Sequence, residues 1–420
     1  MTTPLAHRNS TATLLLCCIG SLLALTTMPA PRASAADVQQ ILKRVPLVDG
    51  HNDLPWQFRK VQNDLSMIDL TQELRGGKLN LVTDIPRLRA GGLGAQFWSV
   101  YVRAEPGGAV PVQAVLEQID VVHRLVALYP NDLELALTAA DIQRIHRKGK
   151  IASLIGMEGG HSINNSLAVL RMAYNLGARY MTLTHTKNTD WADAAGDEAR
   201  HHGLAPFGNQ VVQEMNRLGM LVDLSHVSDE TMRAALRVTS APVIFSHSSA
   251  RALCDNPRNV PDDVLRLVRQ NNGVVMVCFL PGFLNNENSA HFTAATAERE
   301  RLARLYPEEP DKAESEMENW RRQHPAPRAT LAHVADHIDH IRKTAGIDHV
   351  GLGSDFEGFH GQVEGLEDVS RYPALLKELL QRGYTRKEVE KVAGRNLLRV
   401  LRDVERQSVR LRAAAPLTPP

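Results

Sequence analysis

The chain has 420 residues, of which 43% are hydrophobic and 23% are charged, so it can bury a core and is not a disordered, collagen-like or coiled-coil protein. Its 48 lysine and arginine residues balance 47 aspartate and glutamate residues, which argues against nucleic acid or an anionic membrane surface as a partner. The 17 histidines are the unusual feature of the composition, and their positions must decide what they indicate.

The amino terminus is predicted to be a signal peptide that spans residues 1–35. An apolar run, Thr13–Leu25, is about as long as the hydrophobic region of a signal and too short to span a bilayer, and Ala33-Ser34-Ala35 is typical of a cleavage site. We therefore expect an exported protein, periplasmic or secreted, whose mature chain starts near Ala36; an uncleaved signal anchor is the alternative. The proline-rich carboxyl terminus has no hydrophobic stretch, so we expect no lipid anchor there.

Short apolar runs recur from residue 45 onward, and amphipathic segments separate them, a pattern that indicates βα units and a parallel sheet. The eight predicted strands are Val45–Val48, Ala95–Tyr101, Ala152–Gly156, Tyr180–Thr184, Leu221–Leu224, Val243–Ser246, Gly273–Phe279 and His349–Gly353. The predicted helices between them include Pro111–Leu128, Ser166–Leu176, Gly208–Leu218, Asp229–Val238, Asp262–Gln270 and Leu331–Thr344.

Eight βα units favour a single (β/α)8 barrel of the TIM type, here over residues 36–415, whose active site lies at the carboxyl ends of the strands. An open doubly wound sheet is the structural alternative, but the glycine-rich turn that it would carry after its first strand is missing. The highly charged segment 285–328 interrupts the repeat and is predicted to form inserted surface helices after the seventh strand. This insertion is either a solvated decoration or a lid over the barrel mouth.

Residues of the types that commonly bind metals, histidine, aspartate and glutamate, follow most of the predicted strands. His51 and Asp53 follow the first strand, two residues apart and so able to face the same side. Glu158 follows the third strand, where burying a carboxylate is costly unless it is paired or bound to a metal. The fourth, fifth and sixth strands end at histidines and the eighth ends at a further carboxylate: His185, His226, His247 and Asp355.

A lone histidine in such a place is usually a hydrogen-bonded core residue, but this series at one rim of a barrel is hard to assign to chance. Its imidazoles and carboxylates suit zinc, and would also suit manganese, cobalt or iron. Because the set exceeds the ligands of one tetrahedral zinc, two metals that share a carboxylate are the economical arrangement. Such a pair can turn a bridging water into hydroxide near neutral pH and polarise a carbonyl group.

At this point the sequence closely resembles the membrane (renal-type) dipeptidases, peptidase family M19, in a bacterial-type form. The resemblance runs from about Val45 to Leu401, and the motifs that carry it are VDGHNDLPW, IGMEGGHSI, YMTLTHTKNTDWAD, GMLVDLSHVSD, PVIFSHSSAR, RNVPDDVL and VGLGSDFEG. It implies a zinc-dependent dipeptidase with two zinc ions per chain, and a homodimer is a further expectation from the family.

Residue by residue, the resemblance implies that His51 and Asp53 bind one zinc, that His226 and His247 bind the other, and that Glu158 bridges both. It also implies three catalytic or substrate-binding residues. His185 would contact the substrate and stabilise the tetrahedral oxygen, Arg258 would hold the carboxylate of the dipeptide, and Asp355 would hold the free amine and carry protons.

The sequence departs from the animal members of the family. Lys187 stands where they tend to have a half-cystine, and Leu280 occupies a position that is tyrosine in them, which puts that substrate contact in doubt. Cys254 and Cys278 are left as either a disulfide or two buried thiols. The insertion is more like that of the longer bacterial members.

Two other functions stay open from the sequence alone. One is a related metal-dependent amidase or lactonase that acts on another small carboxylate substrate. The other is a catalytically silent barrel that binds a ligand, which a missing metal ligand would have favoured.

Overall fold

Eight parallel strands close into a barrel in the computed structural model, which describes residues 1–2, 34–77, 79–105, 107–359 and 361–414. In order around the barrel they are β1 (Leu47–Asn52), β2 (Leu93–Tyr101), β4 (Ile151–Glu158), β5 (Ala178–Thr182), β6 (Leu221–Asp223), β7 (Ile244–Phe245), β8 (Val274–Val277) and β10 (Val350–Leu352). The pairing of β1 with β10 and of β2 with β4 closes the ring. The predicted barrel and its eight strands are confirmed, and the open sheet is excluded.

Three further strands were not predicted. β3 (Leu133–Leu135) pairs with the first residues of β4, and β9 (Ala329–Thr330) pairs with β11 (Val363–Glu364) in a separate two-stranded sheet. Every residue of the barrel strands is buried except Tyr101, which is half-buried. This double-sided burial is why the strands read as continuous apolar runs rather than as alternating patterns.

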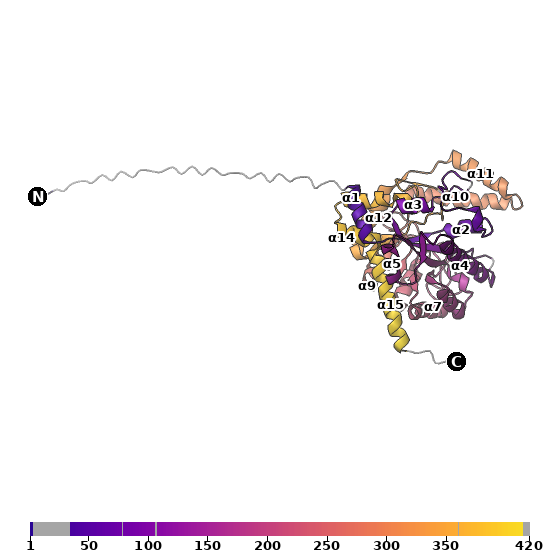
Figure 1. The fold of residues 1–420 in the computed structure, drawn as a ribbon, viewed down its shortest axis with the longest axis horizontal. Helices are drawn as coiled ribbons and strands as arrows, with labels where there is room; N and C mark the ends of the chain where they lie inside the picture. Colours follow the sequence, from indigo (N-terminus) through magenta and orange to yellow (C-terminus); the bar gives the residue numbers. More distant parts are fainter. Residues whose placement is uncertain (3–33, 78, 106, 360, 415–420) are drawn as a thin grey trace. The chain divides into compact units, whose positions relative to one another are not determined.

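Helices cover the outside of the barrel (Figure 1). The six that were predicted lie within two residues of their expected bounds, and they are α4 (Val110–Leu128), α6 (Leu167–Asn175), α7 (Pro206–Leu218), α8 (Asp229–Val238), α9 (Asp262–Asn271) and α12 (Leu331–Thr344). The others are α1 (Ala35–Arg44), α2 (Leu54–Arg59), α3 (Ile85–Ala90), α5 (Ala139–Arg147), α13 (Tyr372–Gln381), α14 (Arg386–Glu390) and α15 (Asn396–Ala414). Short 3₁₀ turns are η1 (Leu65–Met67), η2 (Gly160–Ile163), η3 (Pro281–Phe283), η4 (Ile347–His349) and η5 (Val369–Arg371), and η6 (Lys391–Arg395) is a π-helical turn.

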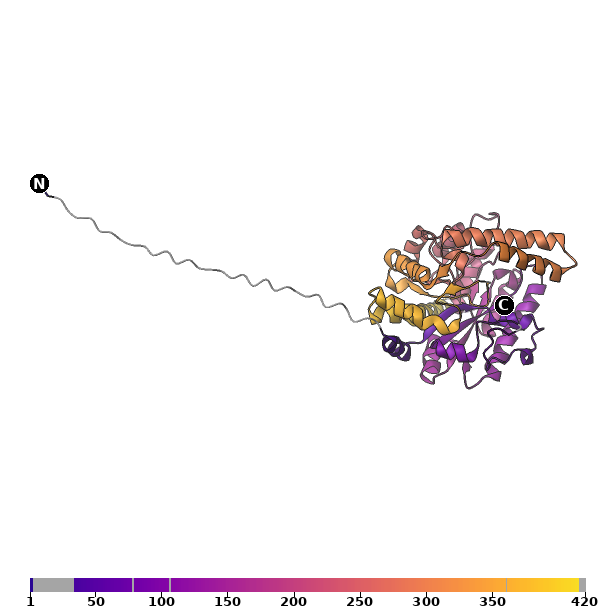
Figure 2. The same ribbon diagram turned by 90° about the horizontal axis from the view of Figure 1, so that it is seen from above.

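The insertion forms two helices, as predicted: α10 (Asn286–Leu305) and α11 (Pro310–Gln323). They lie side by side on the outside of the barrel and are the orange helices of both views (Figures 1 and 2). A single buried side chain on each of their later turns, Leu302 and Met317, faces inward. Most of the other residues of these turns are exposed, and many of them are charged, as the sequence of the segment indicates.

The predicted signal peptide falls largely outside the described residues, since 3–33 are not among them. The described chain resumes at Ser34, whose hydroxyl caps α1 by accepting a hydrogen bond from the backbone N–H of Asp37. Within the described ranges, no helix combines the length and the apolar character that crossing a bilayer requires.

Candidate metal centre

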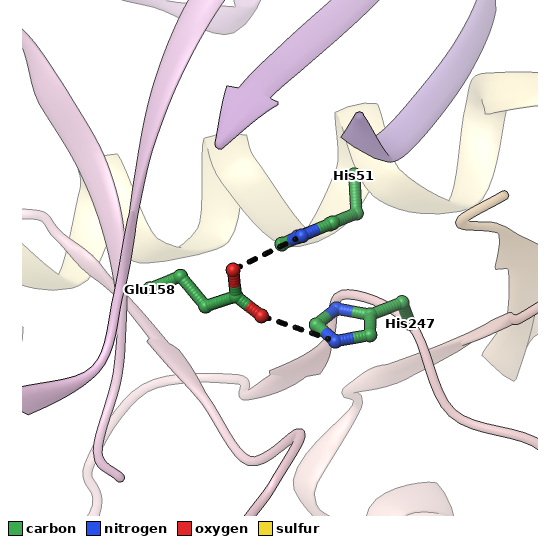
Figure 3. A group of neighbouring side chains, drawn as sticks. All are labelled: His51, Glu158 and His247. Atoms are coloured by element: carbon green, nitrogen blue, oxygen red, sulfur yellow. Dashed lines mark ion pairs between the residues drawn. The ribbon is translucent and has the colours of Figure 1, made fainter. Parts of the chain in front are cut away.

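The carboxyl ends of the barrel strands bring the predicted site residues together. His51 lies in β1 and Glu158 is the last residue of β4, and the other residues lie in the loops just after their strands. Figure 3 shows the carboxylate of Glu158 between the rings of His51 and His247, which reach it from separate strand ends. All of the predicted imidazoles and carboxylates meet at this rim.

Glu158 is the centre of the cluster because its two oxygens face different partners. Its Oε2 lies 3.4 Å from Nε2 of His51. Its Oε1 lies 3.0 Å from Nε2 of His226, 3.5 Å from Nε2 of His247 and 3.6 Å from Nε2 of His185. The carboxylate therefore stands between two groups of donor atoms.

The first group surrounds His51. Its Nε2 lies 3.2 Å from Oδ2 of Asp53 and 3.9 Å from Oδ1 of Asp355. Backbone hydrogen bonds hold these residues together, since the Asp355 N–H donates to the carbonyl of His51 and the Asp53 N–H donates to that of Phe356. The ends of β1 and β10 are thereby joined, which places both aspartates beside the histidine.

The second group is formed by His226 and His247, whose Nε2 atoms lie 2.9 Å apart. His226 has a φ of 70°, and Asp355 of the first group has a φ of 65°. Residues other than glycine seldom adopt this left-handed conformation because it strains the backbone, and such strained residues are concentrated at functional sites. The backbone is thus bent at two places to aim side chains into the cluster.

A buried carboxylate sets the tautomer of His247. The Ser246 hydroxyl donates to Oδ2 of Asp223 at 2.6 Å, and Nδ1 of His247 lies 2.8 Å from the same hydroxyl oxygen. Because a carboxylate can only accept, the one hydroxyl proton points to Asp223, and Nδ1 of His247 must donate its own proton to Ser246. Nε2 then keeps its lone pair toward the cluster, as a metal ligand requires.

Tyr180 supports His51 from the opposite side of the ring. The hydroxyl of this fully buried tyrosine lies 2.8 Å from Nδ1 of His51, and it reaches that position because residue 156 is glycine: a Cβ there would stand 2.0 Å from Cζ of Tyr180. Nε2 of His51 is buried and has no hydrogen-bond partner among the described residues. A buried ring nitrogen without a partner is costly, and a cation at that point would remove the cost.

The charges of the cluster also fit a cation. Burial raises the pKa of Asp355 well above its usual range, with the charges of Asp53 and Glu158 adding to the effect. Burial likewise raises the pKa of Asp53. Burial also lowers the pKa of His226 and of His247 well below the usual range, so these imidazoles are neutral. Burial and mutual repulsion thus oppose the ionisation of these carboxylates, and a divalent cation held by them and by the neutral imidazoles would remove that penalty.

The geometry groups the donors into three sets of atoms that could each hold an ion. They are His51, Glu158 and His247; Glu158, His185 and His226; and His51, Asp53 and Asp355. Glu158 and His51 each occur in two of these sets, so the three sets overlap in one cluster. The residues present therefore fit the metals that the sequence predicts.

His185 lies on the open side of the cluster. Its ring stacks on that of His226, with centroids 4.2 Å apart, and contacts the ring of Tyr101 at 4.7 Å. Burial lowers the pKa of His185 to about 4, so the ring is neutral near neutral pH. Tyr101 in turn packs edge-on against Trp56. These aromatic rings form a continuous row of contacts that ends at the cluster.

Arg258 borders the cluster from the loop after β7. It is half-buried, burial lowers its pKa, and no carboxylate of the described residues lies within ion-pair distance of its guanidinium. The side chain contacts the hydroxyl of Ser248 at 3.5 Å and lies over the ring of Phe283, with Cζ 5.1 Å from the ring centroid. An arginine held in this way beside a metal cluster is well placed to pair with a carboxylate ligand.

Cys254 and Cys278 are free thiols, so of the two predicted alternatives the structure has two buried thiols and not a disulfide. Cys254 is buried at the start of the loop that carries Arg258, and Cys278 lies at the cluster with its Sγ 3.6 Å from Oδ2 of Asp355. Leu280 packs with Cys278 and Phe283 in a small apolar group. Leu280 therefore offers only an apolar contact at the position where animal members have tyrosine.

Sequence reasoning missed the residues that orient the cluster, above all Tyr180, Asp223 and Ser246. Asp223 carried a signal, because an acidic residue inside a short apolar strand is costly to bury without partners. Tyr180 carried none, since its partner is His51 on a distant strand.

The fold and the cluster define a barrel with a candidate metal centre at the carboxyl ends of its strands. Residues 35–415 match the family model of the membrane dipeptidases, peptidase family M19. The chain belongs to this family, and the prediction of a metal-dependent dipeptidase is confirmed at that level.

Two curated relatives agree. The chain is 43% identical over 392 residues to dipeptidase aclJ of Aspergillus oryzae, a match that covers 90% of this chain and 83% of the relative. It is also 43% identical over 372 residues to dipeptidase 3 of Mus musculus, which covers 87% of this chain and 66% of the mouse protein.

Solved structures share the fold. The probable dipeptidase PvdM from Pseudomonas aeruginosa superposes with a TM-score of 0.73 at 25% identity. The match covers 90% of this chain and 100% of PvdM. A metallo peptidase from Rhodobacter sphaeroides, solved with a phosphinate mimic of the dipeptide L-Ala-D-Ala, gives a TM-score of 0.68 at 24% identity and covers 86% of this chain and 99% of that one.

Proposed function

We propose that the protein is a zinc-dependent dipeptidase that uses two metal ions to hydrolyse dipeptides with a free carboxyl terminus. The observation that carries this proposal is the position of Glu158, whose two oxygens face two separate groups of donor atoms. In this proposal His51 and Asp53 hold one ion, His226 and His247 hold the other, and Glu158 is shared. When bound, such a pair of ions supplies a hydroxide from a bridging water near neutral pH and polarises the scissile carbonyl.

Arg258 and Asp355 would fix the two ends of the substrate. The guanidinium of Arg258 is a planar fork that can pair with both oxygens of the free carboxylate, so its distance from the cluster selects substrates by length. Asp355 lies 3.9 Å from His51, and its carboxyl group would accept a hydrogen bond from the free amine. Its raised pKa also suits a residue that carries a proton to the departing amine.

His185 would stabilise the oxygen of the tetrahedral intermediate. The ring is neutral because burial lowers its pKa to about 4, and a neutral imidazole can donate one hydrogen bond to an oxyanion. Its Nε2 lies 3.6 Å from Oε1 of Glu158, on the open side of the cluster. A substrate carbonyl above Glu158 would therefore lie within reach of this donor.

Two proposals concern the mature protein. We propose that residues 1–35 are removed as a signal peptide, leaving a single barrel domain over 36–415 that is periplasmic or secreted. The apolar run and the small residues before Ala36 support the first, and mass spectrometry of the purified exported protein tests it. A homodimer is the second proposal, which sedimentation of the purified protein tests.

The enzymatic test is hydrolysis of a panel of dipeptides by zinc-loaded protein. The panel includes L-Ala-L-Ala, L-Ala-D-Ala, which the relative's phosphinate mimics, and the carboxyl-terminal amide of each. We expect hydrolysis of the free dipeptides and a large loss with the amides. Replacing Arg258 with alanine should lower kcat/KM for the dipeptides by roughly 30- to 1000-fold, which is about 2 to 4 kcal/mol. Arg233→Ala, which removes a distant arginine that pairs with Asp263, serves as the matched control.

The alternatives give different results. An amidase or lactonase with another substrate would hydrolyse none of the dipeptides well, and Arg258→Ala would leave its preferred activity nearly unchanged. A silent binding protein would bind zinc and dipeptides without turnover. Either result contradicts the proposed function.

A further inference from the structure

The loop that carries Arg258, residues 254–259, is tied to the inserted helix α10 by a buried side chain. Oδ1 of Asn256 accepts the backbone N–H of Arg258 at 2.9 Å. Nδ2 of Asn256 donates to the hydroxyl of Ser289 on α10 at 3.1 Å and to the carbonyl of Gly282 at 3.3 Å. Asn256 is 6% exposed, so these bonds are shielded from water. One amide group therefore links the backbone of Arg258 to the insertion.

Further hydrogen bonds fasten the same loop on both sides of Asn256. The backbone N–H of Asp255 donates to Oδ1 of Asn286, in the first turn of α10, at 2.8 Å. Nδ2 of the fully buried Asn259 donates to the carbonyl of Phe283 at 2.9 Å. The loop thus lies fixed against η3 and the start of α10.

The guanidinium itself rests on an aromatic pair that the insertion completes. Cζ of Arg258 lies 5.1 Å from the centroid of the Phe283 ring, a distance at which a cation is attracted to the face of the ring. Phe283 packs edge to face with Phe292 of α10, with centroids 6.4 Å apart. Phe283 is buried, whereas Phe292 is 42% exposed. Phe292 therefore covers the ring that supports the arginine.

These contacts bear on what the insertion does. Its later turns and α11 are exposed and charged, as a solvated decoration would be, but its first two turns are packed and hydrogen-bonded into the Arg258 loop. A mobile lid would not be expected to be hydrogen-bonded at several points to the loop that carries Arg258. The start of α10 belongs to the structure of the site.

We propose that the first two turns of α10 position Arg258, with Ser289 and Phe292 as the residues through which the insertion sets affinity for the substrate carboxylate. This inference rests on the proposed function, in which Arg258 binds that carboxylate. Ser289 and Phe292 are positioning residues, since neither reaches the metal cluster.

The test is a double-mutant cycle on the full-length, zinc-loaded protein with L-Ala-D-Ala or the best dipeptide of the panel. Ser289→Ala and Phe292→Ala should each raise KM by roughly 3- to 10-fold, the factor expected for the loss of one net hydrogen bond or one aromatic contact, and leave kcat within about 2-fold. In the Arg258→Ala background the same changes should have almost no further effect, because the group that they position is gone. Zinc content should equal that of the wild type throughout.

Matched controls lie on the same helix. Thr296→Ala removes a hydroxyl that donates to the carbonyl of Phe292 within α10, and Leu305→Ala truncates an apolar side chain that is 55% exposed at the end of the helix. Neither should change KM. Ser289→Thr keeps a hydroxyl and should restore most of the wild-type KM. Thermal unfolding of each variant shows that it is folded.

The outcomes separate this inference from the proposed function. If Arg258→Ala raises KM but Ser289→Ala and Phe292→Ala do not, or if their effects persist unchanged without Arg258, the insertion does not act through the arginine and the inference is wrong. If Arg258→Ala itself leaves dipeptide hydrolysis unchanged, the proposed function fails first.

Discussion

His337 should make the folded protein lose stability below pH 6.5. The side chain lies in α12 and is fully buried. The backbone N–H of Ala250 donates to its Nδ1 at 2.9 Å, and its Nε2 lies 3.0 Å from the carbonyl of Leu284. Because a backbone N–H can only donate, Nδ1 must be unprotonated and Nε2 carries the proton. A second proton would have to bind Nδ1, where its N–H would point at the backbone N–H of Ala250 and break that hydrogen bond.

The size of the effect follows from the pKa. Burial lowers the pKa of His337 from 6.5 to about 4 in the folded state. Between these values the unfolded chain binds a proton that the folded chain does not, so stability is full above pH 6.5 and falls as the pH decreases toward 4. At pH 4.5 the loss from this one group is roughly 2 to 3 kcal/mol, because each pH unit in the window costs about 1.4 kcal/mol.

The measurement is urea unfolding of the wild type and of His337→Gln at pH 7 and pH 4.5, in a chelator so that metal binding does not contribute. Glutamine does not titrate, so we expect the variant to be less stable at pH 7 and the difference in the free energy of unfolding to shrink by about 2 to 3 kcal/mol at pH 4.5. A difference that stays constant across this range would show that His337 does not cause the loss of stability at low pH.

Three other predictions concern the cluster. Asp223→Asn should weaken the binding of one metal ion by about 10- to 100-fold in a competitive chelator titration, since it disturbs the chain that sets the tautomer of His247; equal affinity would contradict this. Gly358→Ala should block metal binding and leave the fold intact, because a Cβ there would lie 2.4 Å from Oδ2 of Asp53 and 2.5 Å from Oδ1 of Asp355; an active variant would contradict it. Removing the metal with a chelator should abolish dipeptide hydrolysis and lower the melting temperature, and zinc should restore both; activity that survives complete removal would contradict metal dependence.

The strands and the rim residues could be predicted because their signals are local. A strand buried on both faces reads as an apolar run, and a residue such as Glu158 or His247 that follows such a run must lie at the rim of a barrel. β3 (Leu133–Leu135) was missed because it is short and two of its residues are only half-buried. It pairs with only the start of β4 and adds no βα unit to the barrel.

The rest of the site depends on contacts between distant parts of the chain. Tyr180 is 129 residues from His51 in the sequence, and no local pattern indicates that its hydroxyl would meet that ring. The insertion could be predicted as helical from its composition, but nothing in its charges shows that Ser289 would bond to the loop of Arg258. The clustering of the donor side chains could therefore be predicted from the sequence, and the residues that orient them could not.

The metal content and turnover of Glu158→Gln would show whether Glu158 is shared between two metal ions. Glutamine keeps the shape of the side chain but cannot offer a charged oxygen to each of two ions. The wild type should bind about two zinc ions per chain, and the variant should lose at least one of them together with ~10²-fold or more of its dipeptidase turnover, whereas Glu117→Gln on the surface should change neither. A Glu158→Gln protein that keeps both ions and normal turnover would contradict the proposal that two metal ions share the Glu158 carboxylate.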